Sequence, residues 1–185
     1  DTNFLKNRNE TKLSGTYSRE VSTIYDATTQ AIESEIGNIS INNEYIDFIY
    51  RMIKRDTFEL GYINETIDFF MKEVVTNREN LISSISNMLI KYSKDDELWI
   101  DTLYALSHLK YEHLVPHGVM IAGSALCRKN IRIKEMAIVM FEEWRNVEAL
   151  EFLKEMETGV PWLDKYVDAV INDIERVINR DGVSA

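Results

Sequence analysis

Apolar residues recur along the stretch from Asn130 to Ile178 with the spacing of an α-helix, which places their side chains on one helical face. A first series is Ile133, Ala137, Met140, Phe141 and Trp144, and a second is Trp162, Tyr166, Val170 and Ile174. The two series start 29 residues apart, at Ile133 and Trp162, and a period in this range is typical of stacked helical repeats. We therefore expect helices that pack side by side, with Trp144 and Trp162 in their core.

Glycine and proline are scarce in the 185 residues, with seven glycines and two prolines. Both Pro116 and Pro161 stand where a helix is expected to begin, a position that tolerates proline because its missing N–H would have no partner there. Little turn chemistry is left for β-hairpins, and a hydrophobic content of 45% can bury one sizeable core. The composition predicts a single all-α domain over residues 16–180, preceded by a flexible tail over residues 1–15.

The periodicity divides this domain into about eight or nine helices. The expected ranges are 16–36, 43–54, 64–76, 78–92, 95–109, 116–127, 130–144, 146–156 and 161–178. Asp95 is expected to cap the fifth of them. In the third, Ile63 is expected to share one face with Ile67, Phe70 and Val74.

Residues 116–127 read PHGVMIAGSALC and are apolar nearly all round, so we expect them to form the most buried helix. Gly123, Ser124 and Ala125 are small enough to let a neighbouring helix approach closely. Cys127, the single cysteine, is expected to be a small buried side chain. A lone cysteine excludes an internal disulfide and indicates a reducing compartment, which favours a cytoplasmic protein.

The formal net charge is −10, and it is concentrated in the second half of the chain. Residues 95–185 hold ten basic and seventeen acidic residues, a net charge of −7. Nucleic-acid binding needs clustered lysine and arginine to neutralise phosphates, so this balance argues against a nucleic-acid partner. A basic protein partner is favoured, and the alternative is a solvated surface that keeps the protein soluble.

A metal site is the first candidate for chemistry, because His108, His113 and His117 lie close in sequence to Glu112 and Cys127. Pro116 interrupts a continuous helix through the three histidines, and the sequence has no HExxH pattern, so we expect no metal site.

Catalytic and cofactor motifs are likewise not found, so we predict no enzyme and no cofactor. Neither Cys127 nor any serine has the setting of an activated nucleophile, and the chain lacks a glycine-rich phosphate loop. The neighbouring carboxylates Glu142 and Glu143 point to different helix faces, which favours solvation over acid–base work. The tryptophans Trp99, Trp144 and Trp162 lie on packing stripes and are expected in the core.

A family pattern is present at residues 130–153, which read NIRIKEMAIVMFEEWRNVEALEFL. Asn130 forms a polar turn, Ile133 and Lys134 an apolar–basic pair, and Ala137 a small position, while Glu148, Ala149 and Leu150 open a partner helix. This pattern resembles the HEAT repeat, in particular the short units of phycobilisome-lyase-type proteins. The resemblance covers residues 130–178, with a looser copy at 95–115 and only helical hairpins at 43–94. It implies a short right-handed α-solenoid of stacked hairpins.

HEAT-like proteins include bilin lyases, scaffolds, transport factors and DNA-repair glycosylases, so the fold alone cannot choose a function. We expect a non-enzymatic module that binds another protein through an acidic surface. The candidate surface consists of Glu135, Val139, Glu142, Asp164 and Asp168. The alternatives are a chromophore lyase, a DNA glycosylase, or an acidic inhibitor of the immunity-protein type. We expect no membrane association, because no apolar run approaches about 18 residues.

Overall fold

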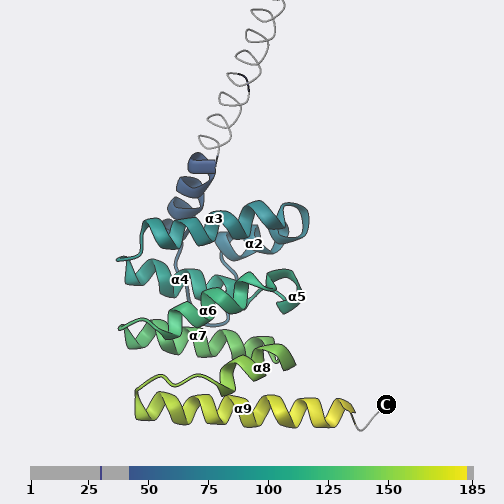
Figure 1. Cartoon of the computed structure of the whole chain (residues 1–185). Helices are drawn as coiled ribbons and strands as arrows, with labels where there is room; N and C mark the ends of the chain where they lie inside the picture. The colour runs from purple at the N-terminus through teal and green to yellow at the C-terminus, as the bar shows by residue number, and fades with distance from the viewer. Residues whose placement is uncertain (1–29, 31–41, 183–185) are drawn as a thin grey trace, which may run out of the picture. The chain divides into compact units, whose positions relative to one another are not determined.

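The computed structural model describes residue 30 and residues 42–182. The chain divides into two compact units, Asp1–Glu44 and Tyr45–Ala185, and the labelled helices of Figure 1 belong to the second. Every regular element among the described residues is a helix, which confirms the predicted all-α class. None of these helices is both long and apolar enough to cross a membrane. The predicted tail over 1–15 and, apart from the helical residue 30, the predicted helix over 16–36 lie outside the described residues.

Residues 42–55 are helical, and the labelled helices follow them. They are α2 (Glu65–Thr76), α3 (Arg78–Lys91), α4 (Asp96–Ser107), α5 (Tyr111–Leu114), α6 (His117–Leu126), α7 (Ile131–Trp144), α8 (Val147–Lys154) and α9 (Pro161–Gly182). The bounds agree closely with the predicted ranges, with two exceptions. The short α5 was not predicted, and α9 continues beyond residue 178.

Side-chain caps explain where four of these helices begin. The first backbone N–H groups of a helix have no partner within it, and a preceding Asn or Asp side chain can accept from them. Asp95 accepts from the N–H of Leu98 at 3.0 Å, as predicted. Asn64, Asn130 and Asn146 cap α2, α7 and α8 in the same way.

The helices of the second unit pack in two sets. One set forms a contact series in which α2 meets α4, α4 meets α7, and α7 meets α9. The other helices cover these, with α3 against α2, α6 against α4 and α7, and α8 against α7 and α9. Figure 1 shows them following one another in chain order from α2 and α3 to α9. The loop that precedes α2 lies against α4, where Tyr104 is hydrogen-bonded to Glu59 and Gly61.

The predicted packing face of α7 is confirmed, and in α9 the predicted positions Val170 and Ile174 are buried, but the first two predicted positions are each one residue early. Ile133, Ala137, Met140, Phe141 and Trp144 are all buried. In α9 the buried residues are Leu163, Val167, Val170 and Ile174, whereas Trp162 is 50% exposed. The buried series of the two helices are thus offset by 30 residues, not 29. Trp162 stands directly after Pro161 at the helix start, one position ahead of the buried stripe, so its indole turns toward solvent.

Three further apolar positions differ from expectation because they lie at or beyond helix ends or on an outer face. Ile63 precedes the cap Asn64 and is 49% exposed. Cys127 follows the last residue of α6 and is exposed. Within α6, Met120 is 67% exposed, so this helix is buried on one side only and not nearly all round. The close approach expected at Gly123 is confirmed, because a Cβ there would lie 2.5 Å from Cζ of Phe152.

We predict that Gly118→Ala lowers the free energy of unfolding by about 1–3 kcal/mol, the usual cost of overpacking. Alanine would favour an isolated helix by about 1 kcal/mol, but its Cβ would lie 2.7 Å from Cβ of Leu114 and 3.1 Å from Cη2 of Trp144. A Cβ cannot move without its backbone, so Leu114 cannot give way. Urea unfolding followed by circular dichroism measures the change.

Ser124→Ala, on the exposed side of the same helix, is the control and should leave the midpoint nearly unchanged. A midpoint for Gly118→Ala at or above that of the wild type would contradict the close packing of α5, α6 and α7.

Candidate functional site

A hollow of about 540 Å³ lies between the loop that precedes α2 and the helices α4 and α7. Its lining consists of Leu60, Gly61, Tyr104, Ser107, His108, Leu109, Lys110, Val139 and Glu143. The volume falls within the range of small-ligand and side-chain pockets. Three separate segments of the chain build it, so its shape depends on how the loop over residues 56–63 is held.

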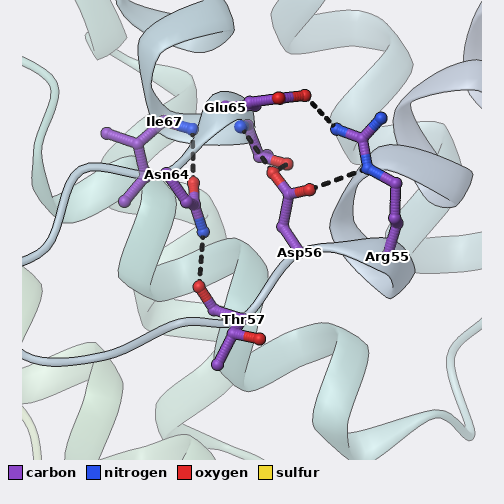
Figure 2. Close-up of polar contacts among 7 residues, drawn as sticks. Arg55, Asp56, Thr57, Asn64, Glu65 and Ile67 are labelled. Carbon is purple, nitrogen blue, oxygen red and sulfur yellow. Dashed lines mark hydrogen bonds and ion pairs between the residues drawn. The ribbon is translucent and has the colours of Figure 1, made fainter.

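The base of this loop is held by two buried polar side chains, drawn in Figure 2. Asp56 accepts from the backbone N–H of Thr66 at 2.8 Å and from its hydroxyl at 2.7 Å. Asn64 donates to the carbonyl oxygen of Thr57 at 3.0 Å while it accepts from the N–H of Ile67 at 2.9 Å. The same bonds satisfy free N–H groups at the start of α2 and fix both ends of the loop.

The tip of the loop is the β-turn Glu59–Tyr62, with Leu60 as its second residue. Tyr62 donates its N–H to the carbonyl oxygen of Glu59 at 3.1 Å, and Gly61 has φ of 79°, the positive value that a type II turn requires at its third residue. The hydroxyl of Tyr104 donates to the Glu59 carbonyl at 2.8 Å and accepts from the Gly61 N–H at 3.2 Å. Helix α4 therefore holds the turn in place, with Leu60 96% exposed.

The polar groups at the end of α4 are already paired. Nδ1 of His108 lies 2.8 Å from the carbonyl oxygen of Tyr104, and the hydroxyl of Ser107 donates to the same oxygen at 2.8 Å. Because a carbonyl only accepts, Nδ1 carries the proton and Nε2 of the neutral ring is an acceptor. The rings of Tyr104 and His108 lie 4.8 Å apart. The hydroxyl of Ser107 also lies 3.4 Å from Nδ1 of His108, but both groups donate to the same backbone oxygen, which is not the geometry of a nucleophile beside its base.

The three histidines occupy different places. His108 lines the hollow between α4 and α7, while the carbonyl of His113 accepts from Arg78 at 2.6 Å. His117 lines a separate apolar groove with Trp99 and Met120. Among the described residues, no group of three or more His, Cys, Asp or Glu side chains is arranged to hold a metal ion.

The five residues of the candidate surface are distributed over α7 and α9. Glu135 and Asp168 are exposed, and Val139 lines the hollow. Glu142 accepts a hydrogen bond from the hydroxyl of Tyr166 across the two helices. Asp164 accepts from the N–H and hydroxyl of Thr158 at 2.8 and 2.6 Å, so its carboxylate is used to fix the turn that leads into α9.

The expectation that Glu142 and Glu143 point to different helix faces is wrong here, because Glu143 lies with Glu135 and Glu142 near one phenol, that of Tyr166. Positions 135, 139, 142 and 143 follow helical spacing on one face of α7, and we call the three glutamates the acidic strip. Burial, then the hydrogen bond to Glu142, then the charges of Glu142, Glu135 and Glu143 raise the pKa of Tyr166. All three carboxylates therefore act on one phenol. Within the described part of the chain, neither Glu135 nor Glu143 forms an ion pair.

Further carboxylates crowd the exposed side of α4. Burial, and secondly the charge of Glu97, raise the pKa of Asp101 to about 6, although Lys54 opposes the shift. Glu97 itself is paired with Arg132 of α7 at 2.9 Å.

Comparison with known proteins gives no match to this chain, whether with family models, curated proteins or solved structures. The hollow and the acidic strip are therefore the features from which a function can be inferred.

Proposed function

We propose that the unit Tyr45–Ala185 is a short right-handed α-solenoid of HEAT-like repeats that binds a basic protein and has no enzymatic activity. The 30-residue offset between the buried series of α7 and α9 supports a repeat. Lys134, the basic member of the apolar–basic pair, donates to the carbonyl oxygen of Thr158. The basic residue of the pair would then donate a hydrogen bond to the turn that precedes the next repeat, and so link the two repeats.

The observation that carries the binding proposal is the acidic strip beside a hollow with an exposed leucine at its rim. Carboxylates without cationic partners on a packed helix raise the negative potential over that face, and such a potential attracts and orients a cationic partner. The rigid helices beneath keep the strip in one geometry, which lowers the entropy lost on binding.

Charge reversal of the strip tests this proposal. We expect Glu135→Lys combined with Glu143→Lys to weaken binding of a fluorescein-labelled peptide of alternating arginine and leucine by about tenfold, measured by fluorescence anisotropy at low salt. Both side chains are exposed, so the fold should persist. Binding by the wild type should fall as salt is added, because exposed charges are screened.

The matched control is Glu155→Lys combined with Glu157→Lys, which changes the net charge equally at two exposed residues after α8. Asp164 belongs to the candidate surface but is not changed in this test, because its carboxylate fixes a turn. Lys154 of α8 does not serve as a control, because it is paired with Glu151 and Glu175. If the strip variant and the control variant bind the peptide with equal affinity, only the net charge matters and the proposal is wrong.

A further inference from the structure

The hollow has features that charge attraction alone does not require, and they indicate which part of a basic partner it receives. A leucine that is 96% exposed is held at its rim by the turn Glu59–Tyr62. Two bonds to the hydroxyl of Tyr104 fix that turn. A single exposed apolar side chain is ordinary on a protein surface, but Tyr62 and Ile63 of the same loop are also exposed, at 60% and 49%. Several exposed apolar side chains on one anchored loop, with Leu60 lining a hollow, are typical of a contact surface.

Inside the hollow, the chemistry suits a planar cation. The ring of His108 lies beside that of Tyr104 and offers Nε2 as an acceptor, and Glu143 supplies a carboxylate. A guanidinium group stacks on aromatic faces and donates several hydrogen bonds at once, which an ammonium group does less well. Val139 contributes an apolar wall for the methylene groups of a long side chain.

One group in the lining opposes a cation. Lys110 lies at the rim with its side chain 76% exposed, and its Nζ is 3.9 Å from a carboxylate oxygen of Glu112. Its charge is therefore partly compensated and directed toward α5, but it should still repel a second cation.

We infer that the hollow receives an arginine side chain of a basic partner segment, and that an aliphatic residue beside this arginine packs on Leu60. This inference rests on the proposed function and specifies the partner as a segment that combines arginine with a neighbouring aliphatic residue. Charge complementarity with Glu143 and the acidic strip selects such a segment over a second copy of this acidic chain.

Two labelled peptides of equal charge test the inference, one of alternating arginine and leucine and one of alternating arginine and serine. We expect the wild type to bind the leucine peptide about tenfold more tightly, since burial of one aliphatic side chain is worth about that factor. Leu60→Ser should abolish this preference and leave the affinity for the serine peptide unchanged. Because Leu60 is almost fully exposed, the substitution should not disturb folding.

Variants inside the hollow should act in opposite directions. Glu143→Gln should weaken binding of the leucine peptide, and Lys110→Ser should strengthen it, while replacing arginine by lysine in the peptide should weaken it. If both peptides bind equally and Leu60→Ser has no effect, the inference is wrong even where reversal of the acidic strip still weakens binding. If reversal of the strip acts no differently from its control, the proposed function itself fails.

Discussion

Trp144→Ala is expected to lower the free energy of unfolding by about 3–5 kcal/mol, the range for large aromatic residues removed from a core. Trp162→Ala, the same chemical change two helices later, is expected to cost less than about 1 kcal/mol, as for an exposed position. Trp144 is 9% exposed and Trp162 is 50% exposed. Urea unfolding of the two variants, followed by circular dichroism, provides the measurement.

The surroundings of Trp144 explain the size of the expected loss. Its ring lies 5.6 Å from that of Tyr111 and 5.8 Å from that of Phe141, both in edge-to-face geometry. It also fills the space beside Gly118. Its indole N–H is buried without a hydrogen-bond partner among the described residues. The cost of burying this unpaired donor offsets part of the stability gained from packing. Similar losses for the two tryptophan variants would contradict the register of α9 found here.

The tryptophan pair also illustrates what the sequence can predict about this fold. The spacing of apolar residues within α7 identified its buried face, and the polar residues Asn130 and Asp95 marked helix starts, because both signals are local. The first half of the α9 series was wrong because Trp162 and Tyr166 are large and apolar in part, so they lead into Val170 and Ile174 as well as Leu163 and Val167 do. Only the packing of α9 against α7 and α8 decides between these two starts, which differ by one residue.

The hollow could not be predicted from the sequence for a different reason. The expected helices over 43–54 and 64–76 left residues 55–63 as a connection, but the bonds from Tyr104 that position this turn join residues more than 40 positions apart. Helical spacing placed Val139 beside Glu135, and Val139 does line the hollow. It gave no indication that Leu60 would lie near them, because a loop has no periodicity from which its direction can be read.

Asp56→Ala is expected to lower the free energy of unfolding by about 2–3 kcal/mol, since hydrogen bonds to charged groups contribute about 1.5–3 kcal/mol and the substitution leaves buried donors unpaired. The donors are the N–H and hydroxyl of Thr66, which is 0% exposed. The side chain of Asp56 is itself only 8% exposed. Asp68→Ala on α2, whose carboxylate is 54% exposed in its pair with Lys72, should cause a much smaller loss.

The pH dependence of the free energy of unfolding distinguishes the effect of the Asp56 charge from the effect of packing. Burial alone would raise the pKa of Asp56, but the bonds from Thr66 and then from Arg55 outweigh it and hold the pKa below the usual 3.8. A carboxylate with a lowered pKa stabilises the folded state above its unfolded pKa, and this stability is lost as the pH falls through the folded value. We therefore expect wild-type stability to decline below about pH 4 more steeply than that of Asp56→Asn, which keeps an acceptor for Thr66 but cannot titrate. Parallel declines of the two proteins would mean that the charge of Asp56 does not hold the loop, and that the neutral bonds of Asn64 and Tyr104 are enough to position Leu60.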